Sequence, residues 1–336
     1  MRPHLHPSLV NGPDGDPAMY VDFLHERRAI LFDLGDIALL PPRKILRVTD
    51  IFISHTHIDH FIGFDHFVRI CLGRDKLVRL FGPAGFVDRV GHRLAAYTWN
   101  LVENYPTDFT VMATEVHEGG TGLSAEFHCL RRFVREGERE VRLEDGILLD
   151  DPAFTVRTSF LDHRTPSLAF AIEEKQHVNI LKNRLEEAGL PVGPWLTKLK
   201  QAVVRQDDPE TLFPVPLEEA GVVRERQMRL GDLQELVVRI VRGQKIAYVT
   251  DAVHSEGNAE RIVSLARDAD YLFIESTFLH EEAERAAEKC HLTARQAGQM
   301  ARAARVARVV PFHFSAKYKG EGERLERELE DAFAGR

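Results

Sequence analysis

The chain contains few cysteines and no long apolar run. Its 336 residues include three cysteines, Cys71, Cys129 and Cys290, which are far apart and odd in number. That spacing excludes a disulfide framework and a cysteine-rich zinc knuckle. No apolar stretch has the length of a signal peptide or of a membrane-spanning helix. We therefore expect a soluble, cytoplasmic protein that does not bind membranes.

Basic residues are also fewer than acidic residues. The chain has 44 basic and 52 acidic residues, which give a formal net charge of −8. A protein that binds nucleic acid over its whole surface would be basic, so a phosphate-rich substrate must be held by a local patch or by metal ions. The hydrophobic fraction of 44% and the charged fraction of 29% are ordinary for a globular protein, which excludes disorder and fibrous repeats.

Histidine, in contrast, is abundant, with 16 residues. Residues 50–54 form a compact apolar run typical of a buried strand, and the next six residues are His55-Thr56-His57-Ile58-Asp59-His60. Three imidazoles and a carboxylate on a loop that leaves a strand form a dense set of metal ligands. Neutral imidazole and carboxylate together suit Zn²⁺, with Mn²⁺ or Fe²⁺ as less favourable alternatives.

Further metal-ligand candidates occur where three later predicted strands end. These candidates are His163 after residues 153–160, Asp251 after residues 246–250 and His313 after residues 309–312. Each alone is weak evidence, but together they match the strand-end placement that a dinuclear metallohydrolase requires. Asp251 is the natural carboxylate to bridge two cations.

The order of the expected elements indicates an α/β fold. The first half consists of short strands mostly joined by turns, and from Lys245 strands alternate with helices. This order predicts two sheets packed face to face with helices outside. In between, residues 177–189 and 195–201 are expected to be helical, and residues 205–244 a loose, charged segment.

Several motifs resemble the metallo-β-lactamase superfamily, and among its branches ribonuclease Z. The histidine motif with His163, Asp251 and His313 carries the first resemblance. The second is carried by Leu161-Asp162-His163-Arg164-Thr165-Pro166-Ser167, Gly189-Leu190-Pro191-Val192-Gly193-Pro194-Trp195, Glu275-Ser276-Thr277-Phe278, His291-Leu292-Thr293-Ala294 and His313-Phe314-Ser315. The resemblance covers most of the chain from Phe32 onward and implies a four-layer αβ/βα sandwich of two mixed sheets.

The resemblance also implies a site with two Zn²⁺ ions per subunit. Its pattern assigns His55, His57 and His163 to the first ion, Asp59, His60 and His313 to the second, and Asp251 to a bridge between them. It further implies that Asp59 orients or deprotonates the attacking water, and that Glu275 and His291 form a pair that places a proton donor near the leaving group. The implied activity is endonucleolytic cleavage of the 3′ trailer of precursor tRNA, leaving a 3′-hydroxyl.

An insertion is expected within a single domain of residues 1–336. The resemblance makes residues 178–242 an inserted arm that contacts tRNA, with Lys198 and Lys200 as candidate contacts, and implies a homodimer. The local net charge of residues 178–206 is +3, but that of residues 178–242 is zero. The charge alone fits a solvated loop equally well.

Departures from the ribonuclease Z pattern lie around the expected substrate and not around the metal. Asp36 follows the Phe32-Asp33-Leu34-Gly35 strand end where the family has a glutamate, and residues 61–69 are bulkier than usual. His66 and His254 lie near the expected site and are candidate substrate contacts. Because of these differences, a small substrate, such as a cyclic nucleotide or another phosphodiester or ester, remains an alternative. A non-enzymatic binder is the weakest hypothesis, because the set of metal ligands is complete. His4 is expected in a mobile terminus, and His177 has no partner at ligand spacing.

Overall fold

The computed structural model describes residues 4–24, 26–219 and 222–336, and the chain divides into two compact units. Residues 5–149, 156–172 and 245–336 form the larger unit, which we call the body. The smaller unit contains His4 and residues 150–155 and 173–244, and we call it the insertion unit. Within the described residues, no helix is long and apolar enough to cross a bilayer.

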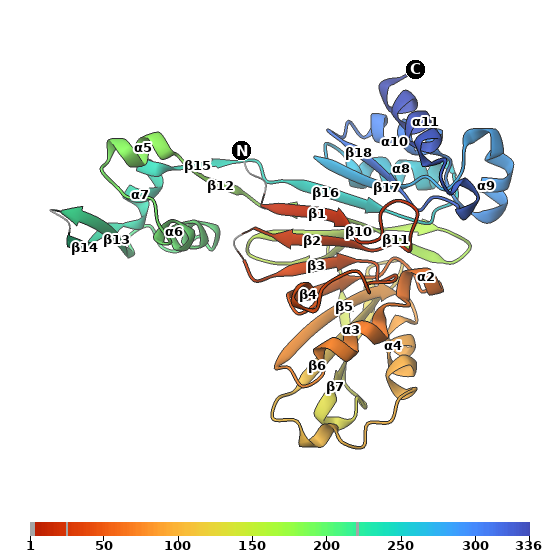
Figure 1. The fold of residues 1–336 in the computed structure, drawn as a ribbon, viewed down its shortest axis with the longest axis horizontal. Coiled ribbons are helices and arrows are strands. Elements are labelled where there is room, and N and C mark those ends of the chain that lie inside the picture. Colours follow the sequence, from red (N-terminus) through yellow and green to blue (C-terminus); the bar gives the residue numbers. More distant parts are fainter. Residues whose placement is uncertain (1–3, 25, 220–221) are drawn as a thin grey trace. The chain divides into compact units, whose positions relative to one another are not determined.

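The body contains a mixed sheet of eight strands, which Figure 1 shows from red β1 to yellow β7. The strands follow one another in space as they do in sequence: β1 (Leu5–Leu9), β2 (Met19–Phe23), β3 (Ala29–Phe32), β4 (Val48–Phe52), β5 (Lys76–Pro83), β6 (Phe109–Val116), β7 (Thr121–His128) and β8 (Arg135–Arg142). The pairs from β3 to β6 are parallel and the other pairs are antiparallel.

A second sheet has six strands, in the spatial order β18-β17-β16-β11-β10-β9. Their bounds are β9 (Ile147–Asp150), β10 (Phe154–Asp162), β11 (Pro166–Glu174), β16 (Lys245–Val249), β17 (Tyr271–Glu275) and β18 (Val309–Phe312). Strands β16, β17 and β18 are parallel, so their carboxyl ends meet at one edge of the sheet.

Aromatic side chains fill the space between the two sheets. Phe32 on β3 lies with its ring centroid 5.6 Å from that of Phe170 on β11 and 5.8 Å from that of Tyr248 on β16. Phe52 on β4 also reaches Phe170, at 5.8 Å. The two sheets therefore pack face to face over a shared aromatic core.

Helices cover the outer face of each sheet. On the eight-stranded sheet, α3 (Phe64–Cys71) and α4 (Phe86–Ala95) contribute buried side chains to one apolar cluster with the strands. On the six-stranded sheet, α8 (Glu256–Ala266), α10 (Ala294–Ala303) and α11 (Gly322–Ala334) do the same. The short helices of the body are α1 (Pro42–Ile45), α2 (Ile58–Phe61) and α9 (Ala283–Lys289). The four layers confirm the αβ/βα sandwich predicted from the sequence.

The insertion unit has its own apolar core. It contains two antiparallel pairs, β12 (His177–Ile180) with β15 (Val238–Val241) and β13 (Leu212–Glu219) with β14 (Val222–Arg229). Its helices are α5 (Lys182–Glu187), α6 (Trp195–Val204) and α7 (Leu230–Val237). Buried side chains from these elements, Trp195 among them, form one cluster, so this segment is ordered by internal packing.

Two predictions for this unit are wrong. Residues 177–180 form strand β12, where the sequence predicted the start of a helix, because their backbone pairs with β15 some 60 residues later. Residues 205–244 are not a loose segment but contain β13, β14, α7 and β15. Pro214 and Pro216 suggested a loop, yet the β13–β14 ribbon has two open edges, where a residue without an N–H group is tolerated.

Candidate metal centre

The histidine motif begins where the buried strand β4 ends. His57 occupies the N-cap position of α2, and Asp59 and His60 lie in that helix. His55 and His60 are buried, whereas the Asp59 side chain is 37% exposed. The turn from strand to helix therefore presents both inward-facing imidazoles and a carboxylate that solvent can reach.

Three other strand ends supply the rest of the candidate ligands. His163 follows β10, Asp251 follows β16 by two residues and His313 follows β18 directly. Asp251 and His313 have positive φ values of 35° and 59°. Left-handed backbone is uncommon for residues other than glycine, and it is found where surrounding structure holds a functional side chain in place.

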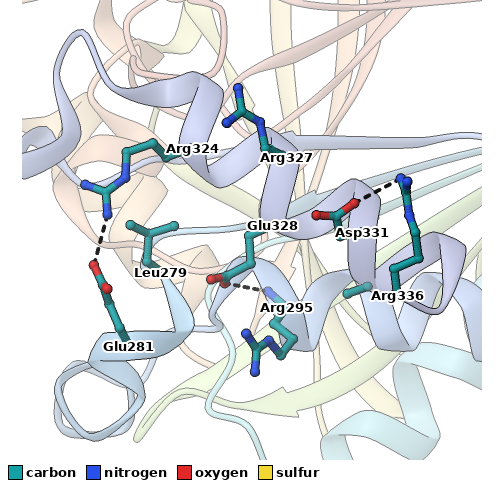
Figure 2. Close-up of a pocket in the computed structure, with 9 residues that line it drawn as sticks. Leu279, Glu281, Arg295, Arg324, Arg327, Glu328, Asp331 and Arg336 are labelled. Carbon is teal, nitrogen blue, oxygen red and sulfur yellow. Dashed lines mark hydrogen bonds and ion pairs between the residues drawn. The ribbon is translucent and has the colours of Figure 1, made fainter.

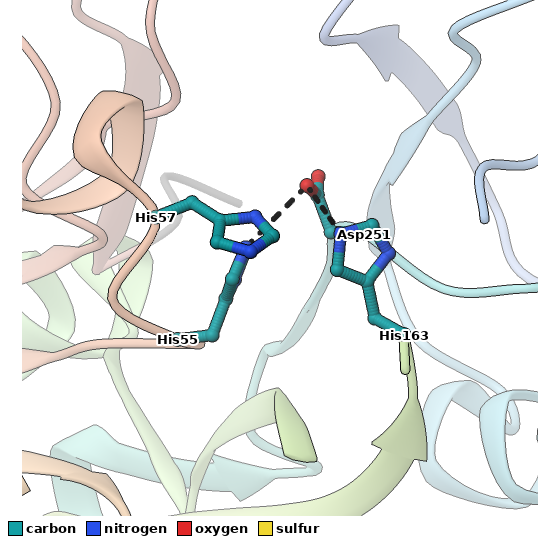
Figure 3. A group of neighbouring side chains, drawn as sticks. All are labelled: His55, His57, His163 and Asp251. Carbon is teal, nitrogen blue, oxygen red and sulfur yellow. Dashed lines mark ion pairs between the residues drawn. The ribbon is translucent and has the colours of Figure 1, made fainter. Parts of the chain in front are cut away.

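The first candidate cluster contains residues from both sheets of the body. His55, His57, His163 and Asp251 each place a ligand atom within 4.8 Å of the others (Figure 3). The Nε2 atoms of His55 and His163 both lie 3.5 Å from Oδ2 of Asp251. Three imidazoles and one carboxylate at these separations form a set that suits tetrahedral zinc.

The second candidate cluster consists of Asp59, His60 and His313, whose ligand atoms also lie within 4.8 Å of one another. The Nε2 atom of His60 lies 3.5 Å from Asp59 and 3.4 Å from Asp251, and Nδ1 of His313 lies 2.9 Å from Asp251. Asp251 thus faces both clusters. This is the position that a carboxylate bridging two cations would occupy, as predicted for Asp251 from the sequence.

The buried imidazoles fit a bound cation. The Nε2 atoms of His55 and His60 are buried and have no hydrogen-bond partner among the described residues. A buried polar atom without a partner is costly, and in a ligand set the cost disappears when the nitrogen binds a metal ion. The donor set of neutral nitrogen and carboxylate oxygen therefore fits a divalent metal.

The electrostatics of the site agree with this assignment. Burial, together with the neighbouring His60, lowers the pKa of His55 to about 2, so its ring is neutral at pH 7, the form that binds metal. Burial opposes charge on Asp251 and His313 as well, but their mutual attraction outweighs it, lowering the pKa of Asp251 and raising that of His313 to about 10. A carboxylate field that favours a proton on His313 also favours a divalent cation.

Asp33, at the end of β3, positions the second cluster. Its Oδ2 atom accepts hydrogen bonds from Nδ1 of His60 at 2.9 Å and from the Tyr248 hydroxyl at 3.0 Å. Ser54 donates its backbone N–H to Oδ1 at 2.7 Å and its hydroxyl to Oδ2 at 2.9 Å. A carboxylate that holds the second nitrogen of a ligating histidine fixes the ring orientation and its tautomer.

Two further contacts fix the residues on the other sheet. Nδ1 of His163 donates to the Cys290 carbonyl oxygen at 2.8 Å, which leaves Nε2 for a metal ion. Glu275, at the end of β17, accepts from Nδ1 of His291 at 2.8 Å and from Ala252 N–H at 2.7 Å. The ring centroid of His291 lies 5.2 Å from that of His163 and 5.5 Å from that of His313.

A cavity of about 610 Å³ opens onto these residues. Its lining includes His57, Asp59, Asp251, His291 and His313. The expected substrate contacts His66 on α3 and His254 do not line it, and their role stays a prediction. Lys198 and Lys200 lie on α6 of the insertion unit, where Lys198 is exposed and Lys200 is half-buried, with burial lowering its pKa.

Comparison with known proteins shows what the chain is similar to. Residues 162–314 match the family model of the beta-lactamase superfamily domain. Ribonuclease Z of Deinococcus radiodurans is 27% identical over 321 residues, which cover 94% of this chain and 91% of the relative. Ribonuclease Z of Latilactobacillus sakei is 29% identical over 322 residues, covering 92% and 85%.

The chain is thus similar to the beta-lactamase superfamily domain over just under half of its length and to proteins named ribonuclease Z over most of it. The matches confirm the resemblance to ribonuclease Z stated from the sequence motifs. The fold and the clusters described above together indicate divalent metal binding.

Solved structures agree on the fold of this chain. The short form of human tRNase Z matches with a TM-score of 0.53 at 19% identity, covering 94% of this chain and 92% of that one. The metallo-β-lactamase fold protein YhfI from Bacillus subtilis matches with a TM-score of 0.54 at 12% identity, covering 96% and 91%. At these identities the matches establish the fold alone.

Two residues that support the candidate metal ligands were not predicted from the sequence. Asp33 was noted as part of a strand end but not as a partner of His60, and Tyr248 only as part of the predicted strand of residues 246–250. The Phe32-Asp33-Leu34-Gly35 strand end could have drawn attention to Asp33. No local signal connects Tyr248 to Asp33, because 215 residues separate them.

Proposed function

We propose that this chain is a metal-dependent phosphodiesterase of the ribonuclease Z type, which removes the 3′ trailer of precursor tRNA and leaves a 3′-hydroxyl. Similarity to relatives named ribonuclease Z over more than nine-tenths of the chain supports the substrate class. The observation that carries the proposal is the Glu275–His291 hydrogen bond, because the His291 side of this pair lines the same cavity as Asp59 and His313.

We further propose that the site holds two Zn²⁺ ions. His55, His57 and His163 would hold the first, Asp59, His60 and His313 the second, and Asp251 would contact both. When bound, two such cations supply an activated water and neutralise the negative charge of the phosphoryl transition state.

Asp59 is the residue that orients the attacking water in this proposal. Its carboxylate lines the cavity and is partly exposed. Burial alone would raise its pKa, but the hydrogen bond from His313 lowers it to about 2, so the group is anionic at neutral pH. An anionic carboxylate accepts a hydrogen bond from water and directs one oxygen lone pair toward phosphorus.

His291 donates a proton to the leaving 3′ oxygen. Its Nδ1 atom is held by Glu275, so Nε2 is the nitrogen that can face substrate. Burial lowers the pKa of His291, but the adjacent Glu275 carboxylate outweighs this effect and raises it, which favours the protonated ring. An imidazolium held by a carboxylate is an effective general acid.

The insertion unit is the proposed contact for the tRNA body. Residues 178–242 keep their predicted role as an arm, and exposed Lys198 is its proposed phosphate contact. Half-buried Lys200 is a weaker candidate, because Glu174 lies close enough to influence its pKa. A homodimer and a cytoplasmic location also remain proposals.

The function is tested by comparing three substrates with the Zn²⁺-loaded protein. These are a precursor tRNA with a 3′ trailer, a cyclic nucleotide and a chromogenic diester with one phosphate. We expect a single cut at the trailer junction with a 3′-hydroxyl end, and slow turnover of the one-phosphate diester. Cleavage of the small substrates with none of the precursor would replace the tRNA proposal by the small-substrate alternative.

A further inference from the structure

The catalytic cavity is lined on one side by two cationic residues that the proposed metal site does not use. Arg285 and Lys289, both on α9, line the same 610 Å³ cavity as His57, Asp59, Asp251, His291 and His313. Lys289 is four positions after Arg285 along the helix, so both side chains lie on the same helical face.

Neither cation is well neutralised by the protein. Lys289 is exposed, and no carboxylate lies within ion-pair distance of it in the part of the chain that the structure describes. The carboxylate nearest Arg285 belongs to Glu282, at a long 3.7 Å. Glu282 is already bound by the ammonium group of Lys317 and by the hydroxyl of Tyr318.

A second hollow of the body shows a different arrangement. It has a volume of about 460 Å³ and lies beside α10 and α11, with four arginines in its lining (Figure 2). Two of these are paired at short range, Arg324 with Glu281 at 3.0 Å and Arg336 with Asp331 at 2.9 Å. In the catalytic cavity both cations have at most a weak carboxylate partner, whereas two of the four arginines of the second hollow are paired at short range.

Helix α9 is attached to the site by its C-terminal end. Cys290 ends the helix with a left-handed φ of 63°, and its carbonyl oxygen holds His163. The next residue is His291, the proposed proton donor. Lys289 is therefore two residues from His291. The guanidinium carbon of Arg285 lies 5.8 Å from the ring centroid of Phe278, which is 6.3 Å from that of His291, so the cationic face lies on the His291 side of the cavity.

That position identifies the phosphate that the pair can contact. Cleavage that leaves a 3′-hydroxyl has the 3′ oxygen as its leaving atom, so the strand on the His291 side is the strand 5′ to the scissile bond. The next phosphate on that side belongs to the 5′ position of the nucleotide that receives the new 3′-hydroxyl. Guanidinium and ammonium groups are the usual partners of such a phosphate.

We propose that Arg285 and Lys289 form a phosphate subsite for the ribonucleotide strand, one nucleotide to the 5′ side of the scissile bond. The proposal rests on the proposed function, because the direction of the strand follows from a 3′-hydroxyl product. It explains how a chain with net charge −8 favours a polynucleotide over a diester with one phosphate.

Three dinucleotides test the subsite, written with N for a nucleoside and p for a phosphate. They are NpN, which has only the scissile phosphate, pNpN, which has an added 5′ phosphate, and NpNp, which has the added phosphate at the 3′ end. We expect the Zn²⁺-loaded protein to prefer pNpN over NpN by roughly three- to tenfold in kcat/KM, and to show no such preference for NpNp. In Lys289→Ala and Arg285→Ala the pNpN/NpN ratio falls toward one, and Lys289→Arg restores it. Each lost contact also lowers the slope of log(kcat/KM) for pNpN against log[salt] by about 0.7.

Arg327→Ala is the matched control, because it removes one exposed positive charge from the second hollow and should keep the wild-type ratio. A wild-type ratio of one, or a ratio that both α9 variants retain, would overturn the subsite. Binding is measured in parallel by fluorescence anisotropy of labelled pNpN and NpN, which needs no turnover. Tighter binding of pNpN that depends on Lys289, without cleavage of any dinucleotide or precursor, would support the subsite and refute the nuclease function.

Discussion

Glu275, at the end of β17, joins the loop that follows β16 to the residue His291, which follows helix α9. Its Oε2 atom accepts a hydrogen bond from Nδ1 of His291 at 2.8 Å, while its Oε1 atom accepts one from the backbone N–H of Ala252 at 2.7 Å. Ala252 directly follows the candidate bridging ligand Asp251. One carboxylate therefore fixes both the proposed proton donor and the backbone beside the proposed bridging ligand.

The first prediction concerns proton donation by His291. His291→Ala should lower kcat for RNA cleavage by about 10²- to 10⁴-fold with a small change in KM, because the group acts on the leaving oxygen. Single-turnover kinetics and metal analysis of the same samples check this. Unchanged metal content is expected, and a variant that raises KM at constant kcat would assign His291 to substrate binding instead.

The second prediction concerns the bridging position of Asp251. Asp251→Ala should lower the metal content per chain and abolish turnover, because the carboxylate faces both clusters. Asp162→Ala is its control: that side chain is exposed at the end of β10 and, among the described residues, accepts only a local hydrogen bond from Arg164 N–H. Equal metal content in Asp251→Ala and the wild type, by plasma emission spectrometry, would refute the dinuclear site.

The third prediction concerns the support of His60 through Asp33. Tyr248→Phe removes the hydroxyl that donates to Asp33 and should lower the free energy of unfolding by about 1–3 kcal/mol. It should also weaken metal affinity by about tenfold, because Asp33 holds His60 and loses one of its own hydrogen bonds. Tyr271→Phe on β17 is the control for removing a tyrosine hydroxyl. Competition with a chelator of known affinity measures the effect.

The fourth prediction concerns the pH dependence of the insertion unit. Glu174 is buried and accepts hydrogen bonds from His177 at 3.0 Å and His4 at 3.2 Å. Burial would raise its pKa, but the bonds from His177 and His4 and the N–H of Gln244 lower it from 4.5 to about 2. The stabilisation is therefore complete above pH 4.5 and is lost as the pH falls toward 2.

Glu174→Gln should accordingly destabilise this unit at pH 7 by about 1–3 kcal/mol, and the difference from the wild type should vanish near pH 2. Trp195 lies in the core of this unit, so its fluorescence in a Trp99→Phe background reports the unfolding of the unit alone. Glu187→Gln, an exposed change in the same unit, should have no effect. A difference that persists at pH 2 would show that the charge of Glu174 is not responsible.

The fifth prediction separates the insertion unit from the chemistry. Ile180 and Val238 are direct partners in the β12–β15 pair, so replacing residues 181–237 by a two-residue Asn-Gly turn keeps the ribbon and removes the rest of the unit. The shortened protein should hydrolyse a one-phosphate diester at near the wild-type rate and bind precursor tRNA at least tenfold more weakly. Equal losses on both substrates would make the unit structural.

Much of the metal centre was predictable because its signals are local. The spacing of His55, His57 and His60 along six residues and the position of His163 and His313 after apolar runs are visible in the sequence. Parallel strands bring such positions to one sheet edge without knowledge of the tertiary structure. The structure brings the residues that the motifs selected close to one another, and their role as metal ligands stays a prediction.

The contacts made across long sequence distances were not predictable. His4 was expected in a mobile terminus and His177 without a partner, yet both form hydrogen bonds with the Glu174 carboxylate. Burial of Glu174 and its separation from His4 by 170 residues depend on tertiary packing that no local pattern encodes. The strand β12 was missed for the same reason, because its partner β15 follows two helices and a hairpin.

The parallel register of β16, β17 and β18 makes the metal centre sensitive to strand slippage. Val249 pairs with Ile274, and Glu275 pairs with Phe312, so Asp251, Glu275 and His313 leave the sheet together. A shift of β18 by one residue would turn its side chains to the opposite face. A misfolded form of that kind would keep normal circular dichroism but bind little metal, so metal retention can serve as an assay of correct strand register during refolding.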